Sequence, residues 1–260
     1  FENLRPDIVL TVADRFETLA TATAASYMNI PLAHTQGGEV TGSIDESVRH
    51  AITKLSHIHF PATQLSAERI IKMGENPEMV FLTGCPALDL VHENDNSLDQ
   101  DIFEKHRVTR DQLDPAKPYI LVLQHSVTTE FGSGRQQISE TIDALAPLGY
   151  PVVWIWPNAD AGSEDVAKGL RIAKELRRHC DFHFFLNFTP EDYLKVLANT
   201  ICAVGNSSSF IREGAILGTP AVIVGTRQQK RERGANVMEV PYNAAAIAEA
   251  VRTQIANGPY

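Results

Sequence analysis

The feature that most constrains the fold of this 260-residue chain is a regular alternation of short apolar runs with longer amphipathic segments. The apolar runs at 8–12, 119–123 and 221–224 have the length and composition of buried β-strands. The segments at 16–28 and 163–179 are long enough for helices. Strands that alternate with helices of about ten or more residues are joined by crossover connections. The sequence therefore predicts an α/β fold built from parallel sheets.

The same alternation continues along the chain and predicts the remaining elements. Further strands are expected at 31–34, 57–60, 79–83, 151–155, 182–186 and 201–204. Further helices are expected at 47–55, 64–73, 139–148, 190–198, 209–217 and 246–255.

A polar, turn-rich stretch at 93–97 interrupts the pattern and indicates two Rossmann-like domains. We expect residues 1–92 to form the C-terminal part of the first domain, 93–115 a linker and 116–260 the second domain. Residues 1–5 resemble the end of a helix, so the N-terminal portion of the first domain is expected to be missing. The chain stops in a loop, and sequence is also expected beyond it.

Composition excludes several classes of protein. The net charge of −9 argues against non-specific binding of nucleic acid, which needs a basic surface. Cys85, Cys180 and Cys202 form no disulfide framework, which favours a reducing cytosol. No apolar run reaches the roughly 18 residues of a membrane span, and no signal peptide is recognisable.

Polar clusters follow most of the expected strands. Ligands of open α/β sheets bind beyond the carboxyl ends of the strands. The clusters therefore predict a binding site in a cleft between the two domains. They occur at 14–15, 36–39, 124–125, 157–158, 205–209 and 226–227.

The cluster after Val204 predicts where an anionic ligand binds. Asn206, Ser207 and Ser208 lie between a strand and a helix, where backbone N–H groups at the positive helix end suit a diphosphate. Glu213, about a turn inside that helix, offers a carboxylate for the hydroxyls of a ribose. A plain helix cap is the alternative, because Ser and Asn favour that position without any ligand.

Two clusters in the first half carry candidate acid–base groups. Asp14 and Arg15 offer a carboxylate for proton transfer beside a cation for phosphate, and a helix cap with a surface ion pair is the alternative. Asp45 and Arg49 are four residues apart and share a helix face, for which an intrahelical ion pair is the alternative.

His125 and Arg227 are the candidates in the second half. His125 ends an apolar strand and can shuttle protons or meet a phosphate, unless it is a structural histidine. Arg227 lies nearest the strand end in the basic run 226–233 and is the best diphosphate partner, although a solvated loop is the alternative. For His57 and His59 a structural role is favoured. No zinc-ligand set, P-loop, G-x-S-x-G or G-x-G-x-x-G motif occurs.

These motifs together resemble the UDP-N-acetylglucosamine 2-epimerases, most closely the hydrolysing branch that makes N-acetylmannosamine for sialic acid synthesis or a related sugar for legionaminic-type acids. The resemblance covers nearly the whole chain. The residues that carry it are 14–15, 37–54, 84–86, 124–125, 157–163, 205–208 and 225–228.

The resemblance implies a fold like that of the GT-B glycosyltransferases, with a UDP-sugar in the cleft. It implies anti-elimination of UDP across C1–C2, then addition of water at C1 with protonation at C2. No metal or cofactor is implied, and a cytosolic homodimer or homotetramer is expected. By this resemblance Asp14, Asp45 and His125 match acid–base or substrate-positioning residues, and Arg49 matches a helper beside them; Glu39 is added to this expected catalytic set. Ser207, Ser208, Glu213 and Arg227 match the residues that hold UDP, and the polar clusters add Arg15, Gln36, Asn158 and Asn206 to the expected substrate-binding set.

The chain departs from the family at Gln36, where many relatives carry a glutamate. An amide cannot transfer a proton as a carboxylate does, so the chemistry is expected to rest on Asp14 and Asp45 or to use Glu39. Three other functions stay open. A non-hydrolysing epimerase would form the epimeric UDP-sugar without releasing UDP, a GT-B glycosyltransferase would transfer the sugar to an acceptor, and an inactive sensor would bind UDP without turnover.

Overall fold

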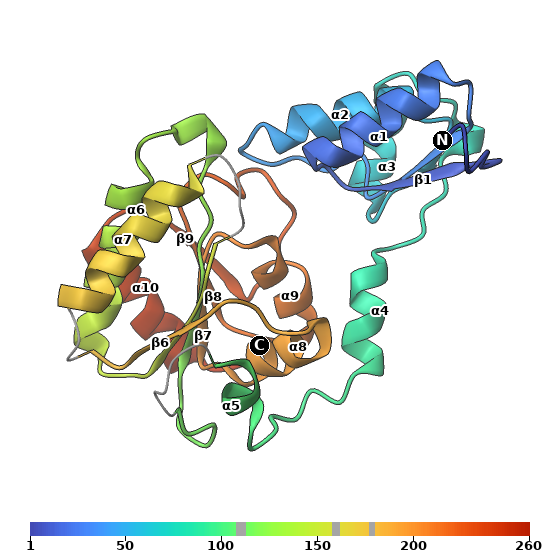
Figure 1. Cartoon of the computed structure of the whole chain (residues 1–260). Coiled ribbons are helices and arrows are strands. Elements are labelled where there is room, and N and C mark those ends of the chain that lie inside the picture. The colour runs from blue at the N-terminus through green and yellow to red at the C-terminus, as the bar shows by residue number, and fades with distance from the viewer. Residues whose placement is uncertain (108–112, 158–161, 177–179) are drawn as a thin grey trace. The chain divides into compact units, whose positions relative to one another are not determined.

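The computed structural model describes residues 1–107, 113–157, 162–176 and 180–260, which divide into two compact units (Figure 1). Unit 1 contains residues 1–86 and 229–231, and unit 2 contains residues 87–228 and 232–260. Each unit has its own parallel sheet and its own buried apolar core, so the α/β class expected from the sequence is confirmed. None of the described helices is both long and apolar enough to cross a membrane.

Residues 1–86 of unit 1, all described, form a parallel sheet of three strands. The strands lie in the order β1 (Val9–Val12), β2 (Leu32–Thr35) and β3 (Ile58–Phe60). The connecting helices α1 (Phe16–Tyr27) and α2 (Asp45–Leu55) lie side by side, and α3 (Gln64–Lys72) follows β3 (Figure 1). Because the strands are parallel, the segments that follow β1 and β2 emerge at the same edge of the sheet.

The strand expected at 79–83 is not formed, so this prediction is wrong. A 3₁₀ turn covers Pro77–Met79 and is capped by the Asn76 side chain. In the described chain, Val80 then makes a single isolated bridge with His59 of β3. A parallel strand is normally buried on both faces, whereas the apolar side chains here are 43%, 47% and 53% exposed at Met79, Phe81 and Leu82.

The described part of unit 2 contains one parallel sheet of six strands in the order β6-β5-β4-β7-β8-β9. The strands are β4 (Ile120–Leu123), β5 (Val152–Ile155), β6 (Phe182–Phe185), β7 (Cys202–Gly205), β8 (Ala221–Val224) and β9 (Val237–Val240). The order runs outward in both directions from β4 and β7, as in doubly wound nucleotide-binding folds. The topological switch point of the sheet is therefore between β4 and β7.

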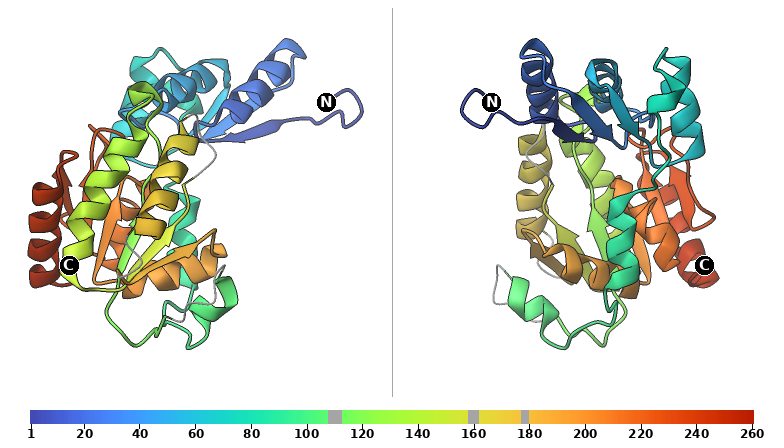
Figure 2. Two further views of the ribbon diagram at one scale, coloured as in Figure 1. Left: turned by 60° about the vertical axis from the view of Figure 1, so that its left-hand side comes forward. Right: turned by 90° about the vertical axis from the view of Figure 1, so that its right-hand side faces the viewer.

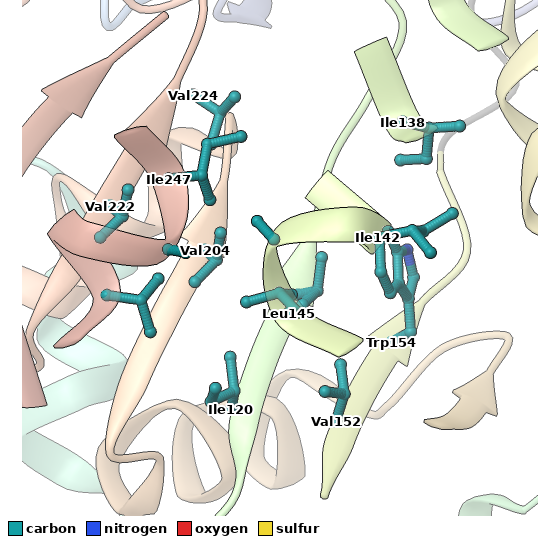
Figure 3. Close-up of a cluster of buried hydrophobic side chains, with 14 of the residues drawn as sticks. Ile120, Ile138, Ile142, Leu145, Val152, Trp154, Val204, Val222, Val224 and Ile247 are labelled. Atoms are coloured by element: carbon teal, nitrogen blue, oxygen red, sulfur yellow. The ribbon is translucent and has the colours of Figure 1, made fainter. Parts of the chain in front are cut away.

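Side chains of this sheet alternate between two cores. Ile120, Val152, Trp154 and Val204 face α6 (Gly134–Leu145) and α10 (Ala244–Asn257), as Figure 3 shows. The next residues along the strands face the opposite core, which contains residues of α5 (Ile102–His106) and α8 (Pro190–Asn199). Helices therefore cover both faces of the sheet, with α7 (Ser163–Leu176) beside α6 (Figures 1 and 2). Burial on both faces explains why these strands are continuous apolar runs.

In the described part of unit 2, β9, α4 (Pro86–Glu93) and α5 were not expected from the sequence. Strand β9 is half-buried and lies at the edge of the sheet, so its apolar pattern is weak. Helix α4 begins at the proline of the Gly-Cys-Pro motif at 84–86. Helix α5 lies within the segment 93–115, and its Ile102 and Phe103 are buried in a core of unit 2.

The helix expected at 209–217 is divided in two. A 3₁₀ turn covers Ser208–Phe210, and a short helix α9 covers Glu213–Leu217. The Ser207 hydroxyl caps the 3₁₀ turn by accepting the Ser209 N–H at 3.3 Å. Because the first turn is capped separately, Glu213 is the first residue of α9 and not a turn inside a longer helix.

Candidate nucleotide-sugar site

Asn206 joins the ends of β4 and β7 at the switch point of unit 2. Its buried side chain makes two hydrogen bonds with the main chain of His125, in which Oδ1 accepts the N–H at 2.7 Å and Nδ2 donates to the carbonyl at 2.9 Å. Gly205 has a φ of 139°, and a Cβ at this position would overlap the carbonyl oxygen of Leu123. Glycine permits this close approach of the two strands. The amide of Asn206 is thus committed to holding His125.

Two side chains from the segment after β8 converge on the carbonyl oxygen of Asn206. Arg227 donates from Nη1 at 3.2 Å, and Gln228 donates from Nε2 at 2.9 Å. The structure therefore brings together His125, Asn206 and Arg227, which the sequence proposed from three separate motifs. A guanidinium and nearby hydroxyls at a switch point suit a phosphate group.

The serines after Asn206 are held by a tyrosine of α8. The Tyr193 hydroxyl is hydrogen-bonded to the Ser209 hydroxyl, which lies 2.8 Å from the Ser207 hydroxyl. Burial raises the pKa of Tyr193 far above its usual range, so this hydroxyl stays neutral. The cap that the sequence allowed as an alternative is therefore formed by Ser207. Ser208, at the start of the 3₁₀ turn, is half-buried.

A second polar group flanks Arg227. Glu130 accepts hydrogen bonds from the Thr226 hydroxyl and from the Gln137 amide. Gly225 has a φ of 81°, and a Cβ there would overlap the Tyr242 ring. Glu130 and Tyr242 thus fix the path of the chain as it leaves β8 toward Arg227.

Arg49 organises the candidate residues of unit 1. It lies in α2, is 1% exposed, and forms an ion pair with Asp14, which follows β1. Its Nη1 also donates to the main-chain carbonyl of Glu39 at 2.9 Å. A buried cation needs this kind of compensation, because removal from water is costly for an unpaired charge. Arg49 therefore connects the segments that carry Asp14 and Glu39.

The carboxylate of Glu39 is held by an arginine from the basic run. Arg231, in the segment 229–231 of unit 1, forms a buried ion pair with Glu39. To accept a proton from a substrate, Glu39 would have to leave this partner. The basic run is therefore not a uniformly solvated loop, and Gln228 and Arg231 within it are buried.

The remaining candidates of unit 1 lie on the same connections. Asp45 is the first residue of α2, and its carboxylate accepts a hydrogen bond from the Ser43 hydroxyl at 2.8 Å. Gln36 is buried with a φ of 58°, and its amide contacts the sulfur of Cys85 at 3.4 Å. Arg15 is exposed and pairs with Glu17 at 3.3 Å. Asn158 lies outside the described residues.

Sequence reasoning missed several residues that support these groups. His34, Tyr193, Arg231 and Tyr242 all contact or flank a candidate residue or its loop. For His34 the available signal was its position at the end of an apolar strand, next to a polar loop. Tyr193 and Tyr242 gave no signal, because their neighbours in space are distant in sequence. Within the described residues, no group of three or more His, Cys, Asp and Glu side chains could hold a metal ion.

Comparisons with known proteins identify the family of this chain. The family model for UDP-N-acetylglucosamine 2-epimerase matches residues 1–259. A UDP-N,N'-diacetylbacillosamine 2-epimerase (hydrolyzing) of Legionella pneumophila is 38% identical over 252 residues, which are 97% of this chain and 65% of the relative. A UDP-N-acetylglucosamine 2-epimerase of Neisseria meningitidis is 31% identical over 260 residues, or 100% of this chain and 66% of the relative. This chain thus spans about two-thirds of their length.

The fold is similar to a solved structure of UDP-GlcNAc 2-epimerase from Methanocaldococcus jannaschii in complex with UDP-GlcNAc and UDP. The TM-score is 0.78 at 16% identity, over 98% of this chain and 70% of that one. Fold and switch-point geometry thus define an α/β protein of the GT-B type with Rossmann-like parallel sheets. The chain belongs to the UDP-N-acetylglucosamine 2-epimerase family.

Proposed function

We propose that this protein is a hydrolysing UDP-sugar 2-epimerase, which converts UDP-N-acetylglucosamine or a related UDP-2-acetamido sugar to the free C2-epimeric sugar and UDP. The observation that carries this proposal is the 38% identity, along 97% of the chain, with a relative named as a hydrolyzing 2-epimerase. The product would be N-acetylmannosamine or its analogue, the precursor type for sialic and legionaminic acids.

The proposed reaction has two balanced steps. In the first, a base removes the C2 proton and the C1–O bond breaks, so that UDP leaves with the bonding electrons and a 2-acetamidoglucal remains. In the second, the oxygen of a water molecule bonds to C1. A proton is delivered to C2 on the face opposite to the one from which the first proton was removed. The first step needs a base near C2 and positive charge or hydrogen-bond donors for the diphosphate.

Unit 1 residues are proposed to perform the proton transfers. Asp14 is the leading candidate, because its carboxylate is 21% exposed while Arg49 holds it in place. Asp45 provides a second carboxylate, oriented by Ser43. Glu39 is the weaker candidate, since Arg231 already occupies its carboxylate. The amide of Gln36 is proposed to orient substrate and not to carry a proton.

Unit 2 residues are proposed to bind the UDP group, with His125 assisting the departure of the diphosphate or the return of a proton. Arg227 supplies a cation beside the main-chain oxygen of Asn206. Ser207 and Ser208 supply hydroxyls, and Glu213 is proposed to hold the ribose. Asn206 is assigned an indirect role, because its amide already holds His125.

The test is turnover of the complete natural protein in heavy water, followed by NMR, with UDP-N-acetylglucosamine and UDP-N,N'-diacetylbacillosamine as separate substrates. The expected result is free UDP and a free epimeric sugar that carries deuterium at C2. Protium retained at C2 would contradict the elimination. An epimeric UDP-sugar without UDP release would identify a non-hydrolysing epimerase, and UDP binding without turnover would identify a sensor. The faster substrate defines the sugar.

A further inference from the structure

His34 occupies a central position in unit 1 that the proposed chemistry does not use. Its imidazole is fully buried at the end of β2. Nε2 lies 2.8 Å from the main-chain oxygen of Ala13, and Nδ1 lies 3.2 Å from the Thr53 hydroxyl on α2. A carbonyl can only accept, so Nε2 carries the proton and Nδ1 accepts from Thr53. Burial lowers the pKa of His34 to about 4, so the ring is neutral at physiological pH.

The residue that His34 holds has an unfavourable backbone conformation. Ala13 has a φ of 57°, in the left-handed region where a side chain other than glycine is strained. Its N–H donates to the Thr35 carbonyl at 3.1 Å, and its carbonyl accepts from His34. These two bonds tie both main-chain polar groups of this strained residue to β2. The next residue is Asp14, whose carboxylate pairs with Arg49.

His34 also contacts the loop after β2, which carries the candidate residues Gln36 and Glu39. A Cβ added at Gly37 would lie 3.0 Å from both His34 Nδ1 and the Thr53 hydroxyl. The backbone of the loop that carries Gln36 and Glu39 therefore packs directly on the His34–Thr53 pair. Because α2 carries Arg49 and Asp45 as well, this pair touches all three segments that present the candidate residues of unit 1.

We propose that His34 is a positioning residue for the 2-epimerase reaction, acting through the Ala13 carbonyl to hold the Asp14 carboxylate in its reactive place on Arg49. The inference rests on the proposed function. His34 is fully buried in the described chain and so acts through Ala13 without contacting the substrate. Loss of its bond to Ala13 lets the strained turn relax, and a carboxylate displaced by even 1 Å loses much of its catalytic effect.

The test compares two substitutions of His34 in the complete natural protein. In His34→Gln the side-chain amide reaches the place of Nε2 and still donates to Ala13. In His34→Asn the amide reaches only the place of Nδ1, so the bond to Ala13 is lost. We expect His34→Asn to lower kcat at least 10-fold with KM for the UDP-sugar changed less than 3-fold, and His34→Gln to keep kcat within about 5-fold. His92→Asn, at an exposed histidine of α4, is the matched control.

A purely structural role would lower the melting temperature of both variants and leave kcat per folded molecule unchanged, which would overturn the proposal. If His34→Asn does not fold, Thr53→Val replaces it, with Thr53→Ser as the rescue. Thr53→Val is then expected to lower kcat at least 3-fold and Thr53→Ser to restore it, and equal kcat values would overturn the proposal. A natural protein that releases no UDP refutes the proposed function itself, and this inference with it. An active protein with an unaffected His34→Asn variant refutes only the role of His34.

Discussion

At the scale of single residues, His34 makes the stability of the protein depend on pH. Burial lowers its pKa from 6.5 to about 4, although the hydrogen bond to Ala13 opposes this shift. Between these values the unfolded chain binds more protons than the folded chain. The stabilising contribution of neutral His34 is therefore complete above pH 6.5 and is lost as the pH falls toward 4.

Between pH 7 and pH 4, we expect the unfolding free energy of the natural protein to fall by up to ~3 kcal/mol more than that of His34→Gln, at about 1.4 kcal/mol per pKa unit. Urea denaturation of both proteins at several pH values measures this difference. Burial also lowers the pKa values of His50 and His59, but both proteins contain these residues. Parallel pH profiles for the two proteins would contradict the prediction.

Asn206 holds the main chain of His125 in unit 2. In Asn206→Ala, the N–H and the carbonyl of buried His125 lose their partners at once. Each unsatisfied group costs about 1–3 kcal/mol, so we expect the two together to lower the unfolding free energy by ~2–6 kcal/mol. Asn257→Ala, at an exposed position of α10, serves as the control and is expected to change it by less than about 0.5 kcal/mol. Similar values for the two variants in urea denaturation would show that Asn206 does not hold His125.

At the scale of elements, Asp192 holds α5 against α8. Burial alone would raise the pKa of Asp192, but hydrogen bonds from Lys105, His106 and Thr189 outweigh it and lower the pKa from 3.8 to about 2. The carboxylate lies 2.7 Å from the Lys105 nitrogen and 2.6 Å from His106 Nε2. Its stabilising contribution is present above pH 3.8 and is lost as the pH falls through about 2.

We expect Asp192→Asn to lower the unfolding free energy by about 2 kcal/mol at pH 7, with the difference from the natural protein shrinking below pH 4. Glu191→Gln removes the same charge from the exposed neighbouring residue and is the matched control. Denaturation curves at pH 7 and pH 3 measure both effects. If the difference in unfolding free energy between the two proteins does not change with pH, Asp192→Asn destabilises the protein through the geometry of the amide and not through the missing charge.

Elements were predictable from the sequence where burial alone decides the structure. The strands of the unit 2 sheet are apolar on both faces, so β4, β5 and β8 were expected within a residue or two of their observed bounds. The strand expected at 79–83 is wrong, because an apolar run forms a strand only where a neighbour and a covering layer exist. The helix expected at 209–217 is divided for another reason, since Ser207 caps a separate 3₁₀ turn at Ser208–Phe210 that ends before α9 begins at Glu213.

At the scale of the whole molecule, the sequence could predict which strand ends carry polar groups but not how those groups are used. The switch point between β4 and β7 follows from the strand order, which periodicity does not reveal. Long-range pairs such as Arg49 with Asp14 and Arg231 with Glu39 are equally invisible to local patterns. The spacing of Asp45 and Arg49 suggested a helix ion pair, and it gave no sign of the ion pair that Arg49 makes with Asp14 from the loop after β1.

The candidate residues fall into two sets, one in each unit, and the proposed function assigns them separable tasks. Asp14→Asn removes the proposed base and is expected to lower kcat by at least about 100-fold, while the dissociation constant of UDP changes less than about twofold. Arg227→Ala removes a charge-assisted hydrogen bond from the proposed diphosphate site and is expected to weaken UDP binding about 10-fold or more. Calorimetry with UDP and a UDP-release assay measure the two effects.

Two controls are needed to interpret these measurements. Asp14→Asn also leaves buried Arg49 without a charged partner, so its folding must be verified by melting before kcat is interpreted. Arg135→Ala, at an exposed arginine of α6, controls for the loss of one positive charge from unit 2 and is expected to bind UDP normally. If Asp14→Asn weakens UDP binding as much as Arg227→Ala does, nucleotide binding cannot be assigned to unit 2 alone. If Arg227→Ala binds UDP normally, the proposed diphosphate site is wrong, and the serines after Asn206 become the next positions to test.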